Sequence, residues 1–430
     1  MNPQAEELNK IILAKNPAVY EMLSEKGKNI FFPKKGILGQ TADAKGTKIN
    51  ATIGAAVEDD NTPMRLEAIA SKLGIDPALA FPYAPSYGRP DIRAKWKSMI
   101  YKKNPSMNGF EISLPVVSNA LTHGVSMAGY LFMEEGEEII VSNLFWGNYN
   151  LILNHAYGTK MKTFNLFKNG GFDLEAFTSK LNEGGIGKKV VILNFPNNPS
   201  GYTPTMKEYN DIVKALEDSA KAGNKIVAVL DDAYFGLVYE EGIAEESLFA
   251  VLGNLHENIL AVKVDGPTKE DYVWGFRVGF MTYGIKGGTA ELYAALEAKT
   301  AGAIRGNISN ASNLSQSLLM VAFDHAEYDA QKAAKFDIMK ARYDAVKVAL
   351  TQDKYLSYFE AIPYNSGYFM CVQLHEGIDG EALRKLLIEK YSIGIINLNN
   401  LIRIAYSAVA ASDVEELFEG LYGACKELKG

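Results

Sequence analysis

Several predicted strands of this sequence end in residues that could together bind a charged, planar ligand. Val190 to Phe195 is a β-branched, apolar run that breaks sharply at the turn Asn197 to Gly201. Open α/β sheets bind ligands where parallel strands end, so polar residues at other strand ends favour a shared site. Candidate residues occur at five predicted strand ends: Ala120-Leu121-Thr122, Trp146, Asn198, Asp231 and Lys269. Taken singly, each is more often a helix cap, a core aromatic or a turn residue, and only their joint position points to a site.

One strand end and an arginine form a candidate phosphate site. At Ala120, Leu121 and Thr122 a strand passes into a helix, where backbone N–H groups and the helix dipole favour an anion. Arg277 follows Lys269 by eight residues and is placed to return to the same edge of the sheet. A guanidinium beside a helix N-terminus would complete the phosphate site.

The remaining groups suit an aromatic cofactor. Trp146 offers a flat face, Asn198 and Tyr234 offer an amide and a phenol, Asp231 offers a carboxylate, and Lys269 offers an amine. Pyridoxal 5′-phosphate needs an anchored phosphate, a held ring and a lysine for its Schiff base. The sequence therefore predicts a pyridoxal 5′-phosphate site.

From about Ile49 to Ala405, the chain resembles the fold type I pyridoxal-phosphate aminotransferases of class I/II, within the aspartate aminotransferase superfamily. The motifs that carry the resemblance are Tyr83-Ala84-Pro85-Ser86-Tyr87-Gly88, Phe145-Trp146-Gly147-Asn148, Asn197-Asn198-Pro199, Asp231-Asp232-Ala233-Tyr234, Pro267-Thr268-Lys269 and Leu401-Ile402-Arg403-Ile404-Ala405. They occur in the order found in that family.

The resemblance implies a role for each cofactor residue. Lys269 would form the Schiff base, Arg277 would pair with the phosphate, and Trp146 would stack on the ring. Asp231 would lie against the pyridine nitrogen, and because strand side chains alternate between faces, Asp232 should not share that role. Tyr234 and Asn198 would hydrogen-bond the phenolate oxygen of the cofactor. The catalytic residues are then Lys269, Asp231 and Tyr234.

The resemblance also implies a substrate site and a homodimer with shared active sites. Arg403 matches the arginine that binds the substrate α-carboxylate, with Gly54 as the backbone site beside it and Asn198 close by. Tyr83 resembles a tyrosine that contacts the phosphate of the neighbouring subunit. Arg305 resembles an arginine that binds a distal carboxylate in the partner site, which favours aspartate or glutamate as substrate. Alternatively, Arg305 is an interface salt-bridge residue.

Three residues depart from the family pattern. Gly266 stands where many members have a serine, so one phosphate hydroxyl is missing, and Thr268 is the candidate replacement. Leu121 replaces a small residue of the phosphate loop, and Ile308 replaces an aromatic residue in the Arg305 segment. The departures weaken the prediction of the substrate more than that of the cofactor.

The expected reaction is transamination between an L-amino acid and a 2-oxo acid. Lys269, displaced from the cofactor by the substrate amine, would act as general base on the Cα proton. The same scaffold also supports decarboxylases and C–S or C–C lyases, because fold does not decide reaction. A cofactor-binding regulator without turnover is a third possibility, which the presence of both Lys269 and Arg403 disfavours.

The elements that must position these residues alternate between strand and helix, which predicts an α/β fold with a mostly parallel sheet sandwiched by helices. Its seven strands are expected at residues 114–119, 138–143, 162–167, 190–195, 226–232, 259–265 and 275–282, the last antiparallel. Helices are expected over residues 5–25 and 63–79 and from residue 122. The cofactor-binding domain is expected at 61–325, and a smaller α+β domain with an N-terminal arm at 1–60 and 326–430.

Composition excludes several other classes of protein. The formal net charge of −7 argues against nucleic-acid or anionic-membrane partners. His256-Glu257 lacks a second histidine at position 260, so no zinc helix is present and no metal is expected. Two isolated cysteines, Cys371 and Cys425, fit a reducing compartment. With no apparent signal peptide or apolar span, a cytoplasmic protein is expected.

Overall fold

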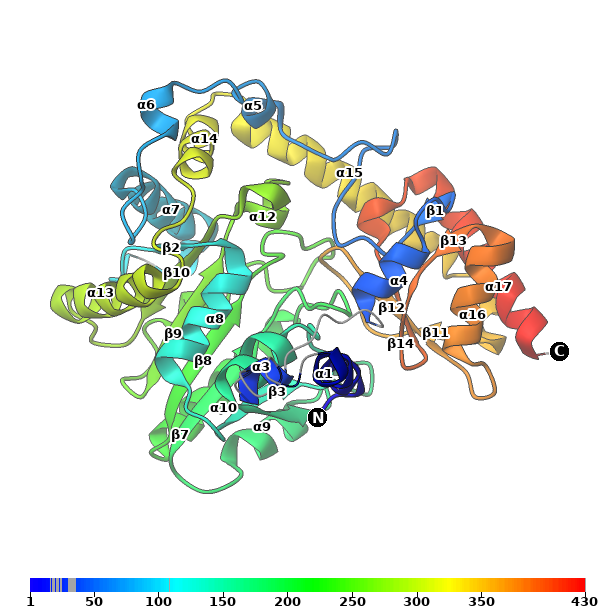
Figure 1. The fold of residues 1–430 in the computed structure, drawn as a ribbon, viewed down its shortest axis with the longest axis horizontal. Helices are drawn as coiled ribbons and strands as arrows, with labels where there is room; N and C mark the ends of the chain where they lie inside the picture. The colour runs from blue at the N-terminus through cyan, green and yellow to red at the C-terminus, as the bar shows by residue number, and fades with distance from the viewer. Residues whose placement is uncertain are drawn as a thin grey trace.

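The centre of the molecule is a seven-stranded sheet. The computed structural model describes residues 1–429 except 16, 18, 19, 21, 22, 24, 30–35 and 108. Only β10 is antiparallel to its neighbours within this sheet of the described chain, so the predicted α/β fold with a mostly parallel sheet is confirmed. In spatial order the strands are β2 (Val116–Ser118), β10 (Gly279–Gly284), β9 (Ile259–Asp265), β8 (Lys225–Asp231), β7 (Lys188–Leu193), β3 (Glu138–Ser142) and β4 (Lys160–Phe164) (Figure 1).

The two faces of this sheet bury different side chains. Successive residues of a strand point to opposite faces, so Leu230 of β8 packs into one core and Val229 into the other. The first face, here called the α7 face, is covered by α7 (Pro90–Lys103), α10 (Met206–Lys221) and α11 (Phe249–Leu252). The second, the α8 face, is covered by α8 (Ala120–Phe132) and α13 (Ala290–Asn307).

A second, antiparallel sheet lies beside the first. Its order is β11 (Phe359–Ala361), β12 (Met370–Leu374), β15 (Leu401–Ile404) and β14 (Ile396–Leu398). The helix α15 (Tyr328–Ala349) runs towards it from the side of the first sheet, and α16 (Gly380–Leu386) and α17 (Val414–Lys429) pack around it (Figure 1). The strand β1 (Ile49–Asn50) pairs in parallel with β13 (Ile393–Gly394). The predicted domain boundaries stay a prediction.

Two local predictions differ from the structure. The helix expected at 63–79 is replaced by α5 (Glu67–Ala70), turns, and α6 (Pro77–Ala80), because Asp76 caps a new helix that begins with Pro77. The helix expected at 5–25 is described as α1 (Pro3–Lys15), and part of the rest lies outside the described residues. Among the described helices, none is both long and apolar enough to cross a membrane.

Candidate active site

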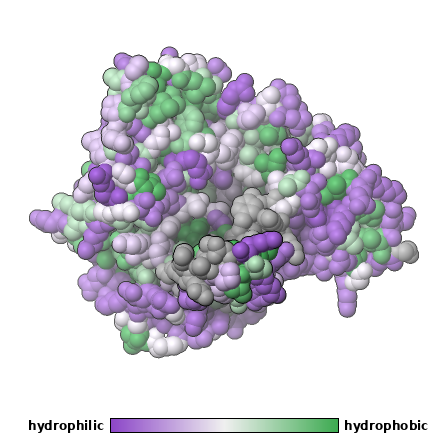
Figure 2. Space-filling model, in the orientation of Figure 1, coloured by the Kyte–Doolittle hydropathy of each residue, from purple (hydrophilic) through white to green (hydrophobic). Residues whose placement is uncertain are grey.

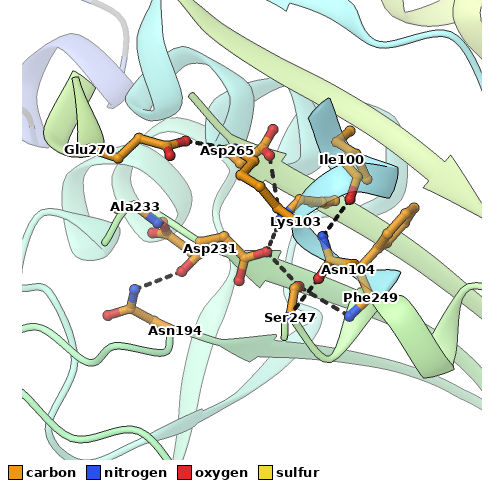
Figure 3. Close-up of polar contacts among 12 residues, drawn as sticks. Ile100, Lys103, Asn104, Asn194, Asp231, Ala233, Ser247, Phe249, Asp265 and Glu270 are labelled. Carbon is orange, nitrogen blue, oxygen red and sulfur yellow. Dashed lines mark hydrogen bonds and ion pairs between the residues drawn. The ribbon is translucent and has the colours of Figure 1, made fainter. Parts of the chain in front are cut away.

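Asp231 lies at the end of β8 on the α8 face and is buried. The Tyr149 hydroxyl donates to its Oδ2 at 2.5 Å, and the Ala233 backbone N–H donates to its Oδ1 at 3.2 Å. The Asn194 side chain donates to the Asp231 carbonyl at 2.8 Å, as Figure 3 shows. Burial raises the pKa of Asp231 to about 6, while the Tyr149 hydrogen bond opposes this rise. Asp231 is therefore a buried carboxyl group whose ionised form is stabilised by the Tyr149 hydroxyl and the Ala233 N–H.

Lys269 lies in the short helix α12 (Pro267–Glu270), which follows β9 at the same edge of the sheet. The Tyr368 hydroxyl donates to the Lys269 carbonyl at 2.7 Å and fixes the backbone of this turn. The Lys269 Nζ lies 5.4 Å from the centre of the Tyr234 ring. Burial and the nearby Arg277 charge lower the pKa of Lys269 to about 8. The neutral amine, which a nucleophile or base requires, is thus more populated at neutral pH than for an ordinary lysine.

Arg403, on β15 of the second sheet, reaches the turn that follows β7. Its Nη1 lies 3.4 Å from Asn198 Oδ1, and its Nη2 donates to the Thr52 carbonyl at 3.1 Å. The guanidinium lies 4.4 Å from the centre of the Phe369 ring. It is 3% exposed, and its Nε has no hydrogen-bond partner among the described residues. A buried cation with an unused donor is suited to an incoming carboxylate.

The neighbours of Arg403 link the two sheets. Tyr234 is buried, makes a side-chain hydrogen bond with Asn198, and has its pKa raised by burial. Gly54 is half-buried, and a Cβ built on it would lie 3.5 Å from the Phe369 ring. The structure therefore brings the predicted Asn198, Tyr234, Arg403 and Gly54 together.

The helix α8 begins where the phosphate site is predicted. Ala120 has a positive φ of 62°, which turns the chain from β2 into the helix. Asn119 makes no side-chain capping hydrogen bond to this helix within the described chain, so the first N–H groups, including those of Leu121 and Thr122, are left for another acceptor. The guanidinium of Arg277 is exposed, with Nη1 3.1 Å from the Trp274 carbonyl.

Gly266 and Leu121, two residues that depart from the family pattern, lie next to each other. A Cβ on Gly266 would lie 3.0 Å from Gly279 Cα and 3.2 Å from Leu121 Cδ1, closer than side-chain contacts normally allow. Leu121 therefore occupies space beside the position where a serine side chain would begin. The hydroxyl of Thr268 is buried and lies 3.5 Å from the Val278 carbonyl. The main chain at Gly279 and the Leu121 side chain therefore both favour glycine at position 266.

Trp146, Tyr83 and Arg305 are placed differently from the others. Trp146 is half-buried, with its ring 5.7 Å from that of Tyr149 and nearly perpendicular to it. Tyr83 is 90% exposed, and Arg305 is exposed with Nη1 2.9 Å from the Ser309 hydroxyl. A single chain therefore does not bring Tyr83 and Arg305 into the buried cluster around Lys269.

Sequence reasoning missed Tyr149, which contacts Asp231 directly. The available signal was its position three residues after Trp146, in a turn where the Tyr149 N–H donates to the Trp146 carbonyl at 2.9 Å. The phenol belongs to a different strand end from Asp231, so only the three-dimensional arrangement reveals the pair.

A large cavity lies on the α7 face, next to the Lys269 turn. Its volume is about 680 Å³, and its lining includes Lys103, Phe235, Glu270, Tyr328 and Lys332. The predicted site residues in the described chain are absent from this lining. We locate the candidate site at the Asp231–Lys269–Arg403 cluster, because chemically suited groups converge there.

Comparison with known proteins identifies the family. The model of the family "Aminotransferase class I and II" matches residues 66–421. The chain belongs to this family. Enzymes of the class I and II aminotransferase family use pyridoxal phosphate. The unused α8 N–H groups, the Arg277 guanidinium and the Lys269 amine are groups that such a cofactor requires.

Individual relatives within the aminotransferase family are distant. The chain is 28% identical over 258 residues to an aspartate aminotransferase from Bacillus sp. (strain YM-2), covering 56% of this chain and 59% of that protein. It is 25% identical over 235 residues to a probable N-acetyl-LL-diaminopimelate aminotransferase from Bacillus subtilis, covering 54% of each. The matches thus span little more than half the length of these curated relatives.

Solved structures of aminotransferases share the fold over nearly the whole chain. An aminotransferase from Anaerococcus prevotii has a TM-score of 0.82 at 23% identity, covering 94% of this chain and 98% of that one. The cytoplasmic aspartate aminotransferase of Saccharomyces cerevisiae has a TM-score of 0.73 at 18% identity, covering 96% and 100%. At these identities the structures establish the fold.

Proposed function

We propose that this protein is a pyridoxal-phosphate-dependent aminotransferase that moves an amino group between an L-amino acid and a 2-oxo acid. The observation that supports it most is the convergence of a lysine of lowered pKa, a buried carboxylate and a buried arginine with an unused donor. These groups come from β8, the turn after β9, and β15.

The proposed cofactor would be held by groups from five parts of the chain. The N-terminus of α8 at Ala120 to Thr122, with Arg277 and the Thr268 hydroxyl, would bind its phosphate. Asp231 would hold a proton on the ring nitrogen, and Trp146 would cover one face of the ring. When bound, pyridoxal phosphate supplies an electron sink that stabilises negative charge at the substrate Cα.

The side chains of this protein would then bind the substrate and move one proton. Arg403 would pair with the substrate α-carboxylate, beside Gly54 and Asn198. Tyr234 and Asn198 would donate hydrogen bonds to the cofactor phenolate. Lys269 Nζ would remove the proton from the substrate Cα, which a pKa of about 8 permits near neutral pH.

The proposed active unit is a homodimer that acts on dicarboxylic substrates. Figure 2 shows a hydrophobic area over α5, α6 and α14 (Asn313–Phe323), and these elements carry the exposed Leu79 and Leu314, with Phe81 next to α6. Tyr83 follows directly, so its exposed phenol could extend into the site of a second copy, and Arg305 could bind a distal carboxylate there. If Arg305 instead forms a salt bridge at the interface, it would be equally exposed in a single chain.

Spectroscopy and product analysis test the proposal. Purified protein supplied with pyridoxal phosphate should show a visible absorption band that Lys269→Ala abolishes, and a panel of amino acids with 2-oxoglutarate should identify the donor. A protein without such a band would refute the assignment. Formation of alanine or ammonia from aspartate, in place of oxaloacetate, would indicate a decarboxylase or lyase on the same scaffold.

A further inference from the structure

A lysine that the proposed reaction does not use is fully buried next to the site. Lys263 lies on β9, on the α7 face, with 0% exposure. Its Nζ forms an ion pair with the Asp232 carboxylate and lies 3.4 Å from Asp265 Oδ2. Burying an ammonium is costly unless it is paired, so the two carboxylates are what hold Lys263 in its charged form. Burial opposes the charge of Lys263, but Asp232 and Asp265 raise its pKa.

Almost all polar groups around this ion pair have hydrogen-bond partners. Asp232 also accepts from the Ser247 hydroxyl at 2.6 Å, and Asp265 Oδ1 accepts from the Trp96 indole N–H at 2.9 Å. The Lys263 Nζ also lies 4.7 Å from the centre of the Phe235 ring.

The next charges lie near the same Phe235 ring. Lys103 Nζ lies 5.4 Å from the centre of that ring and pairs with Glu270 at 2.8 Å. Lys332 also pairs with Glu270, at 2.6 Å. Figure 3 shows Lys103, Glu270 and Asp265 near Asp231. The site is therefore backed by a layer of buried charges.

This layer is connected to the proposed site through sequence neighbours. Asp232 follows Asp231 but points to the opposite face, and its charge raises the pKa of Asp231. Glu270 directly follows Lys269 in the sequence and pairs with Lys103 and Lys332. Within the described chain, Lys263 is the cation that pairs with Asp232.

We propose that Lys263 is a positioning residue for the cofactor site, whose charge offsets that of Asp232 and so limits the negative charge beside Asp231. The inference rests on the proposed function. Replacing a whole buried ion pair by apolar side chains is often neutral for stability, whereas removing one partner leaves an unpaired buried charge. The electrostatic role therefore predicts effects that packing alone does not.

The test is a charge cycle in the cofactor-loaded protein. The variants Lys263→Met, Asp232→Asn and the double variant are titrated with pH, and the midpoint of the visible cofactor band is measured. Removing the lysine leaves excess negative charge, which favours the protonated form of the cofactor Schiff base. The pH midpoint of the band's titration should therefore rise by about 0.5 to 1 pH unit. Asp232→Asn should lower the midpoint by a similar amount, and the double variant should return it to within about 0.3 unit of wild type.

A matched control removes one carboxylate at the other end of the strands, away from Asp231. Glu297 pairs with Arg93 at 2.7 Å and accepts from the Leu114 N–H, before β2 begins. Glu297→Gln should leave the midpoint unchanged, although it can lower the melting temperature. Melting temperatures of all variants separate loss of stability from a shift of the band.

The outcomes separate this inference from the proposed function. A wild-type protein without a cofactor band overturns the proposed function and this inference with it. A wild-type band with single variants that shift in the same direction, or not at all, overturns this inference alone. If Lys263→Met does not fold, Asp232→Asn and the double variant decide: a lowered and then restored midpoint supports the inference, and any other pattern overturns it.

Discussion

Tyr149 opposes the effect of burial on Asp231, because its hydroxyl donates to the carboxylate at 2.5 Å. In Tyr149→Phe, Asp231 Oδ2 would be buried without that donor, so the pKa of Asp231 should rise further. The unfolding free energy of the apoprotein should fall by about 1–3 kcal/mol, the usual cost of an unsatisfied buried group. Chemical denaturation measures this loss, and equilibrium dialysis should show weaker binding of pyridoxal phosphate.

Tyr130→Phe is the control for Tyr149→Phe. Tyr130 lies on α8 and is 61% exposed, so the loss of its hydroxyl should change neither stability nor cofactor affinity. Wild-type stability and affinity in Tyr149→Phe would show that the hydrogen bond to Asp231 is unimportant.

The lowered pKa of Lys269 predicts an unusual reactivity in the cofactor-free protein. Burial and Arg277 favour the neutral amine, with a pKa of about 8. Acetylation of Lys269 by a trace of acetic anhydride, followed by peptide mass spectrometry, should rise with pH to a midpoint near 8. Lys207 is the internal reference, because it is exposed and its hydrogen bond to Asp211 raises its pKa. Equal midpoints for the two lysines would contradict the electrostatic description of the site.

At the scale of elements, the turn that follows β7 is the point where the two sheets meet. The Asn365 and Ser366 N–H groups both donate to the Gly201 carbonyl at 2.9 Å. Gly201 has a φ of 73°, and a Cβ there would lie 1.8 Å from the Phe369 carbonyl oxygen. This residue must therefore be glycine for two independent reasons.

Gly201→Ala should lower the unfolding free energy by about 2–4 kcal/mol, because it combines backbone strain with a clash against main chain. Gly184→Ala is the matched control, since Gly184 has a φ of 81° but no atom within 4 Å of the added Cβ. Its loss should stay near 1 kcal/mol. Similar losses in the two variants, measured by urea denaturation, would show that the contact with Phe369 contributes little.

Much of the fold followed from local patterns, and its exceptions have physical causes. The seven strands are apolar and alternate with helices, so their order along the chain was readable, and Ile259–Asp265 matches its expected range. The helix expected at 63–79 was wrong, because its apolar spacing extends across Gly74 and Pro77. In this case the turn residues decided the structure, not the periodicity.

The site could be only partly predicted from the sequence, for a different reason. Residues with a characteristic neighbour sequence, such as Asp231 and Lys269, could be named in advance. Tyr149 and Lys263 could not, because the carboxylates of Asp231 and Asp232 that they contact come from another part of the chain and their own sequence neighbourhoods are ordinary. Their contacts depend on strand order and register, which pair Lys263 with Leu230 and so bring it beside Asp232.

At the scale of the whole molecule, the exposed Arg305 predicts a substrate effect that requires two chains. In the proposed dimer, Arg305→Leu should raise the aspartate KM by about 10-fold or more and leave that of an aromatic substrate nearly unchanged, because a charged contact would be lost. Steady-state kinetics with both substrates measures the ratio. Arg65→Leu, at another exposed arginine, is the control. Equal effects of Arg305→Leu on both substrates would support the interface role.

The parallel pairing of Ile49 with Ile393 has a consequence for synthesis on the ribosome. Chains emerge from the N-terminus and fold as units become complete, so β1 must wait until β13 has been made. The first sheet is complete at Gly284, and by then Asp231, Lys269 and Arg277 have all been translated. Arg403 emerges more than one hundred residues later. In a nascent chain, the residues proposed to contact the cofactor would thus be present well before Arg403, which is proposed to bind the substrate carboxylate.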